Sequence, residues 1–347
     1  MKELLTLAKN KTKIFCIICF ISILILIWSL FGRKIEKYQN NNSTPFPIDI
    51  VYTWTGEKFT NDIRTSNNNE LQYSLRSIME YAPWVNHIYI LMNSPKKTPS
   101  WFNNKYKDII TIYGHDEIFP KHIKVPNTNS NVIETTIHTI PNLKEHFIYF
   151  NDDIFLGRLT KYTDFFTDDG KIVLPDNYFM DNNINLLKNN KEDILNIKYP
   201  KYTSKAWQYH IPFPLRKKYI NEFHKEYKDY IYWIQTESND RKIVGCNICD
   251  KFNLYCPCQH TLFDIQRYMY DKNMVYSKKM NEYEKNWYNY FEASQIMKLD
   301  VNSFVNNKPK FFCINDTEEN AEKREAVKEK INLILQKFYT IKSYFEK

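Results

Sequence analysis

The stretch from His146 to Gly157, HFIYFNDDIFLG, constrains the fold more than any other. A short apolar run that ends in a polar break indicates a buried β-strand. Asp152 and Asp153 follow this run, and ligands of open α/β sheets bind outside the carboxyl ends of the strands. Paired carboxylates at that position can hold Mg²⁺ or Mn²⁺, which also bridge substrate phosphates. The structural alternative is a turn in which Asn and Asp cap local backbone groups.

Strand-like and helix-like segments alternate before this stretch. Residues 48–54, 87–92 and 109–113 are rich in β-branched and aromatic side chains, which predicts strands. Residues 70–82 carry apolar side chains at helical spacing, and Asn131 with Glu134 resembles a capping box that begins a short helix reaching Ile140. The alternation predicts an α/β fold with a Rossmann-like, largely parallel sheet over residues 47–180.

The second half, residues 181–347, is expected to be largely helical and to complete the active site. Residues 217–233 present an apolar face at helical spacing, and residues 310–314 predict a last short strand. Asp316, with Glu319 three residues later, predicts the N-cap of a long final helix. Residues 188–201 are polar and indicate a loop.

Composition and missing motifs narrow the class of protein. The net charge of +8 is mild and spread along the chain, which suits an anionic small substrate and not a nucleic acid. The chain contains no GxGxxG, GxxxxGK[ST] or GxSxG motif, so dinucleotide-binding, P-loop and hydrolase interpretations lack their signatures.

The first residues predict a single-pass membrane protein. Residues 1–13 form a short basic tail, residues 14–31 are uncharged and just long enough to span a bilayer, and residues 32–46 form a polar stem. A cleaved signal peptide is the alternative, but no cleavage site of small residues is evident. The short tail suggests a cytosolic N-terminus with the catalytic part in the ER or Golgi lumen, and glycosylation sites at Asn41, Asn42 and Asn315 would fit that location.

Seven cysteines are present, and four of them cluster. Cys246, Cys249, Cys256 and Cys258, with His260 beside them, could form two disulfides or a structural zinc site. A lumenal location favours disulfides and a cytosolic one favours zinc. Cys313 lies in the last predicted strand and is expected to be a buried thiol, while Cys16 and Cys19 are apolar filler of the anchor.

Several blocks in order resemble the Stealth family, whose members transfer a sugar-1-phosphate from a nucleotide-sugar. They include bacterial capsule polymerases and the α/β subunit of the lysosomal-enzyme N-acetylglucosamine phosphotransferase. The blocks are IDIVYTW at residues 48–54, a long one over residues 70–171 that contains ELQYSLRSIMEYAPWVNHIYILMN and HFIYFNDDIFLGR, His210-Ile211-Pro212, and FFCINDT at residues 311–317. The first block departs from the family pattern, because Trp54-Thr55-Gly56-Glu57 is one residue shorter than W-V-D/N-G-x-D.

The resemblance implies a GT-A-like sheet and attack by an acceptor hydroxyl on the phosphorus that carries the sugar, with nucleoside monophosphate leaving. Asp152 and Asp153 would organise Mg²⁺ or Mn²⁺ and the diphosphate, and His210 would be the base. Arg241, the candidate for the arginine that follows the histidine in the family, would hold a phosphate. The remaining candidate substrate-binding residues are Asp49, Asn129, Asn131, Glu134, Asn315 and Asp316.

The expected partners are a nucleotide-sugar, with a UDP-sugar preferred, a glycan or glycoprotein acceptor and the membrane; a homodimer is compatible with the sequence. Two other functions stay open. One is a metal-dependent glycosyltransferase that releases nucleoside diphosphate, which paired aspartates would serve equally well. The other is a membrane-anchored carbohydrate-binding protein without catalysis. Bacterial relatives act in the cytosol on capsule, which would place the catalytic part on the cytoplasmic face of the inner membrane.

Overall fold

The computed structural model describes residues 44–57, 68–106, 108–176, 210–237, 261–316, 318 and 320–347, and the single residue Ser22. Residues 45–347 form one compact unit, distinct from residues 1–44. Among the described residues, no helix combines the length and apolar character that a membrane span requires. The predicted anchor, the loop at 188–201, Arg241 and the four clustered cysteines lie outside the described residues, apart from Ser22 within the anchor.

A five-stranded sheet in the order β3-β2-β1-β4-β7 forms the centre of this unit. Its strands are β1 (Ile48–Trp54), β2 (His87–Met92), β3 (Ile110–Gly114), β4 (His146–Asn151) and β7 (Phe213–Arg216). The first four are parallel and β7 runs antiparallel to β4. The predicted α/β class is therefore confirmed, with a mixed sheet.

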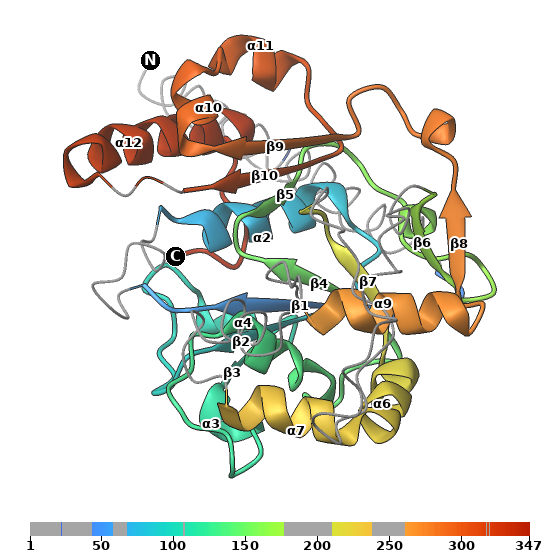
Figure 1. The fold of residues 1–347 in the computed structure, drawn as a ribbon. Coiled ribbons are helices and arrows are strands. Elements are labelled where there is room, and N and C mark those ends of the chain that lie inside the picture. Colours follow the sequence, from blue (N-terminus) through green and yellow to red (C-terminus); the bar gives the residue numbers. More distant parts are fainter. Residues whose placement is uncertain are drawn as a thin grey trace, which may run out of the picture. The chain divides into compact units, whose positions relative to one another are not determined.

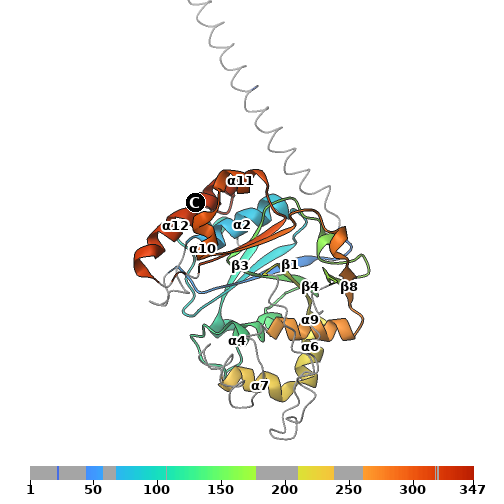
Figure 2. The ribbon, with the colours of Figure 1, turned by 45° about the horizontal axis from the view of Figure 1, so that its top comes forward.

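Helices cover both faces of this sheet, which explains why β1 is buried at every position from Ile48 to Tyr52. Helix α2 (Glu70–Tyr81) lies on one face, and α4 (Ser130–Glu134), α6 (Lys217–Glu226), α7 (Lys228–Glu237) and α9 (Thr261–Asp271) lie on the other, as both views show (Figures 1 and 2). A short helix, α3 (His115–Ile118), follows β3.

A second sheet joins the two halves of the chain on the α2 side (Figure 1). It has the order β5-β10-β9, with β5 (Ile154–Leu156), β9 (Tyr288–Glu292) and β10 (Phe311–Asn315). Helices α10 (Ala293–Lys298), α11 (Val301–Asn306) and α12 (Ala321–Phe338) form its apolar cover. A third sheet pairs β6 (Ile172–Pro175) with β8 (Val275–Lys278). Because β7 extends the first sheet and β5 the second, the two predicted parts are interleaved.

Three predicted helices differ in detail from the structure. The helix predicted over 217–233 is two helices, α6 and α7, that meet at Tyr227. The one predicted from Asn131 to Ile140 is α4 followed by a 3₁₀ turn, Ile137–Thr139. The last helix begins after Asn320, whose side chain accepts hydrogen bonds from two backbone N–H groups, so Asn320 and not Asp316 is its N-cap.

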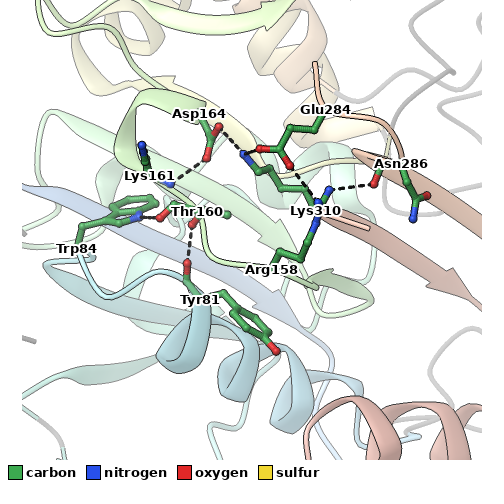
Figure 3. A network of polar contacts seen from close by, with 9 residues as sticks. All are labelled: Tyr81, Trp84, Arg158, Thr160, Lys161, Asp164, Glu284, Asn286 and Lys310. Atoms are coloured by element: carbon green, nitrogen blue, oxygen red, sulfur yellow. Dashed lines mark hydrogen bonds and ion pairs between the residues drawn. The ribbon is translucent and has the colours of Figure 1, made fainter. Parts of the chain in front are cut away.

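A polar network fixes the loop after β5 (Figure 3). Lys310 Nζ lies 2.8 Å from Asp164 Oδ1 and 3.2 Å from Glu284 Oε1, and Arg158 Nη1 lies 3.0 Å from Glu284 Oε2. At its other side, Thr160 N and Oγ1 donate to the Tyr81 carbonyl at 2.7 and 2.8 Å. The network thereby ties the end of α2 to the start of β10.

Candidate active site

The carboxyl ends of the parallel strands meet at one edge of the five-stranded sheet. Pairing places Thr53 of β1 beside Asn151 of β4, and Trp54 beside Met92 of β2. Asp152 and Asp153 form the two-residue turn that leaves β4 at this edge and enters β5. The sheet therefore presents the two aspartates where ligands of α/β folds bind.

A third carboxylate, Glu70, joins them from the first residue of α2, and we call Glu70, Asp152 and Asp153 the acid cluster. Glu70 is 6% exposed. Burial, and then the charge of Asp153, raise the pKa of Glu70 to about 7. Burial and the charges of Asp153 and Glu70 hold the pKa of Asp152 well above its usual range. The three groups thus oppose one another's ionisation.

Asn68 links the acid cluster to the other half of the chain. Its backbone N–H and its side-chain amide donate to the two oxygens of Glu70, each at 2.6 Å. The same amide nitrogen lies 3.2 Å from Asp316 Oδ2. Asp316, predicted as a site residue and as a helix cap, therefore lies beside Glu70 at the end of β10.

Strand β10 reaches Asp153 directly. Ile314 N donates to the Asp153 carbonyl at 3.1 Å, and Cys313 Sγ lies 3.4 Å from Asp153 Oδ2. Cys313 is a buried free thiol, as predicted, and burial and the charge of Asp153 raise its pKa. Asn315 follows on the same strand and donates to Tyr290 Oη at 3.0 Å.

His210 enters the same neighbourhood through two tyrosines of β9. Its backbone N–H donates to Tyr288 Oη at 2.7 Å, and its ring centroid lies 5.1 Å from that of Tyr290. The charge of Asp153 contributes to raising the pKa of both tyrosines, after the larger effect of burial. The structure thus gathers His210, Asn315, Asp316 and the acid cluster around one sheet edge.

Asp49 lies at the opposite edge of the sheet, away from the acid cluster, and the substrate contact suggested for it stays a prediction. It pairs with Phe147 at the amino end of β4, five residues before Asp152 and so roughly 16 Å from it along the strands. Its two carboxylate oxygens accept hydrogen bonds from Asn86 Nδ2 at 2.7 Å and from Lys144 N at 2.8 Å. Asp49 therefore fastens β1 to the loops before β2 and β4.

Asn129, Asn131 and Glu134 bond within the protein. Asn129 caps α4 by accepting from Asn131 N. Asn131 Oδ1 accepts from Thr261 N at 3.2 Å, and Glu134 Oε2 from Leu262 N at 3.3 Å. These bonds join α4 to the start of α9, while the substrate contacts suggested for the three residues stay predictions.

The acid cluster fits a divalent cation only with help from a ligand. Among the described residues, no group of three or more Asp, Glu, His or Cys side chains is arranged to hold a metal ion. Mg²⁺ commonly uses one or two carboxylates, with substrate phosphates and waters completing its shell. Asp152 and Asp153 suit this mode, because their mutual repulsion favours an added positive charge.

Four residues of this neighbourhood were not singled out in the sequence: Asn68, Glu70, Tyr288 and Tyr290. An acid in the first turn of a helix is already expected from the helix dipole, so Glu70 carried no separate signal. The chain has 26 tyrosines, and nothing in the sequence distinguishes Tyr288 and Tyr290 from the others. Their place beside the acid cluster follows from the pairing of β9 with β10.

The amino-acid sequence is similar to a known family model and to bacterial polysaccharide phosphotransferases. Residues 64–174 match the family model Stealth protein CR2, conserved region 2. A capsular polysaccharide phosphotransferase of Neisseria meningitidis is 41% identical over 148 residues, which are 37% of this chain and 40% of that protein. An exopolysaccharide phosphotransferase of Streptomyces coelicolor is 26% identical over 329 residues, 87% of this chain and 53% of that protein. The chain therefore spans about half the length of these relatives or less.

Solved structures that resemble the chain are sugar transferases, at low similarity. Mouse xyloside xylosyltransferase 1 has a TM-score of 0.37 and 10% identity, over 79% of this chain and 98% of that chain. The glycosyltransferase GlyE of Streptococcus pneumoniae has a TM-score of 0.38 and 10% identity, over 86% of this chain and 64% of that chain. Similarity of this degree supports no argument about function. By sequence, residues 64–174 match that family's conserved region 2, which confirms the resemblance to the Stealth family over this part of the chain.

Proposed function

We propose that this protein transfers a sugar-1-phosphate from a nucleotide-sugar to a hydroxyl group of a glycan. The acceptor oxygen forms a bond to the phosphorus that carries the sugar, and the bond from that phosphorus to the bridging oxygen breaks. Nucleoside monophosphate leaves, and the hydroxyl proton passes to a base. The names of the curated relatives, which are capsular and exopolysaccharide phosphotransferases, support this class of reaction.

The observation that carries the proposal is the acid cluster at the carboxyl edge of the sheet. Three clustered carboxylates, in which the charge of Asp153 helps to raise the pKa of Glu70 and Asp152, are an unfavourable arrangement for a purely structural purpose. A bound cation would relieve the repulsion and, together with the diphosphate, give the cluster a function.

In this proposal, Asp152 and Asp153 hold Mg²⁺ or Mn²⁺, which would neutralise charge that develops on the diphosphate. His210 accepts the proton of the acceptor hydroxyl, since imidazole titrates near neutral pH. Asn315 and Asp316, at the end of β10, orient the substrate beside the acid cluster. Two further parts of the proposal rest on the sequence alone: Arg241 holds a phosphate, and residues 14–31 anchor the protein in a membrane.

The test is to identify the nucleotide that the full-length protein releases. The protein is incubated with a panel of UDP-, CDP- and GDP-sugars, a polysaccharide acceptor and Mg²⁺ or Mn²⁺. Nucleoside monophosphate formed together with a phosphodiester-linked sugar supports the proposal. Nucleoside diphosphate would instead indicate glycosyl transfer without phosphate.

Matched variants separate catalysis from carbohydrate binding. Asp153→Asn is expected to lower the rate of release by about 10²- to 10³-fold and His210→Gln to abolish it. Asp229→Asn changes an exposed acid in the first turn of α7 and should behave as wild type. Unchanged activity in both site variants would contradict the assigned roles.

A further inference from the structure

Strand β9 presents two tyrosines to the candidate active site. Tyr288 and Tyr290 are two residues apart, so their side chains leave the same face of the strand. Cys313 of β10 is the register partner of Tyr290, and its Sγ lies 3.4 Å from Asp153 Oδ2. The face that carries the two tyrosines is therefore the face that meets the acid cluster.

These tyrosines contact His210 in two different ways. Tyr288 Oη accepts the hydrogen bond of the His210 backbone N–H at 2.7 Å, which fixes the main chain. The Tyr290 ring packs against the imidazole with centroids 5.1 Å apart and an interplanar angle of 36°, which restricts the side chain. Asn315 Nδ2 donates to Tyr290 Oη at 3.0 Å and so holds the ring itself.

We propose that Tyr288 and Tyr290 are positioning residues that orient His210 toward the substrate hydroxyl, with Asn315 holding Tyr290 in place. This inference rests on the proposed function, in which His210 accepts the acceptor proton. No described helix or strand contains His210, which lies three residues before the start of β7. The side-chain contacts from β9 therefore contribute to its orientation.

The two hydroxyl groups suit positioning and not proton transfer. Burial, followed by the nearby charges, raises the pKa of Tyr288 above its ordinary value, and burial raises that of Tyr290 to about 12. Both phenols therefore remain neutral over the working range of an enzyme and act as hydrogen-bonding and packing groups. A small displacement of a catalytic group can cost about 10²-fold in rate, so their effect on turnover can be large.

The experiment compares Tyr288→Phe, Tyr290→Leu and Tyr290→Phe in the full-length protein, with Tyr276→Phe as the matched control. Tyr276 lies on β8 and is 47% exposed. We expect Tyr290→Leu and Tyr288→Phe to lower kcat by about 10- to 100-fold with KM within about threefold, because substrate binding is kept while the base is misplaced. Tyr290→Phe keeps the ring and should restore kcat to within about fivefold of wild type.

A second measurement does not depend on turnover. The chain has 8 histidines, and the ring resonances of His210 in the full-length protein can be assigned by their loss in His210→Gln. Tyr290→Leu should shift these resonances and leave those of the other histidines in place. Unshifted His210 resonances in Tyr290→Leu would overturn the inference whatever the activity.

The outcomes distinguish this inference from the proposed function. If His210→Gln is inactive but Tyr288→Phe and Tyr290→Leu have wild-type kcat, positioning is refuted and the base role stands. If His210→Gln is fully active, the base role is refuted, and with it positioning for proton transfer. Loss of kcat in Tyr290→Leu, rescue in Tyr290→Phe and shifted resonances together support the inference.

Discussion

Asp49 and Asp152 lie at opposite ends of the same pair of strands and have opposite surroundings. Asp49, at the amino edge, is fully buried and receives hydrogen bonds from Asn86 and from the backbone of Lys144. Burial raises the pKa of Asp49, but those donors and nearby positive charges oppose the rise. Asp152, at the carboxyl edge, faces Asp153 and Glu70, whose charges add to the effect of burial.

The difference contrasts a carboxylate whose partners are supplied by the protein with carboxylates that face one another. At the amino edge the protein supplies the partners of the carboxylate, so nothing further is needed there. At the carboxyl edge the protein gathers negative charge that its own hydrogen bonds do not offset, because the pKa values of Glu70 and Asp152 stay raised.

The strongest test exchanges one acid of the cluster. Asp153→Asn should lower kcat by about 10²- to 10³-fold, because a group that organises transition-state charge is lost. Its thermal stability should be equal to or above that of wild type, since one repulsive charge is removed. Nucleotide release and thermal melting measure the two effects. A clear loss of stability would show that Asp153 is structural, like Asp49.

The reciprocal exchange is made at the amino edge. Asp49→Asn should lower the free energy of unfolding by about 1–3 kcal/mol, because an amide group replaces one oxygen that accepts a hydrogen bond. The folded fraction should keep wild-type kcat, because Asp49 lies far from the acid cluster. Urea unfolding and activity below the transition provide the measurements. A lower kcat with an unchanged free energy of unfolding would contradict the contrast between Asp49 and the acid cluster.

The third prediction concerns the pH dependence of stability. Glu70 has its pKa raised from 4.5 to about 7, so the folded protein binds more protons than the unfolded chain between these values. Stability from this group is present below pH 4.5 and is lost as pH rises toward 7. Glu70→Gln should therefore be more stable than wild type at pH 8, by about 1–3 kcal/mol, and gain little at pH 5. Equal stabilities of Glu70→Gln and wild type at pH 8 would indicate that the hydrogen bonds from Asn68 offset the cost of the buried Glu70 charge.

The smallest effect is that of metal ions. Because no described group of three ligands is present, Mg²⁺ alone should change the melting temperature by less than about 1 °C. Mg²⁺ with a nucleotide-sugar should raise it by about 1–3 °C, and EDTA should reverse the shift. Asp153→Asn should show no joint shift. A large shift with Mg²⁺ alone would instead indicate a preformed metal site.

Much of the first sheet could be predicted from the sequence, because its strands are compact apolar runs with polar ends. Strands β1 and β2 coincide with their predicted ranges, and β10 is displaced by one residue. Strand β5 has three residues, which is too short for a periodic signal, and β9 is only half-buried. The predicted parallel sheet missed β7, whose Pro214 argues against a central strand and fits its place at the edge.

The site was predictable only in part. Asp152 and Asp153 follow an obvious strand, so their place at the carboxyl edge could be expected. Asp49 also lies in a strand that leads to the carboxyl edge of the sheet. It is the second residue of β1, however, and therefore lies at the amino edge. Glu70 and the two tyrosines reach the site through contacts between distant segments, and such contacts leave no local pattern in the sequence.

The hydrogen bond between Cys313 and Asp153 joins residues that are 160 positions apart. A ribosome must therefore make most of the chain before the aspartates acquire their neighbours from β9 and β10. Until then, the nascent chain carries its carboxylates without the tyrosines and amides that surround them in the finished protein. Termination after residue 174 but before β10 would thus yield a chain that contains all of the matched residues 64–174 and lacks the β10 side of the candidate active site.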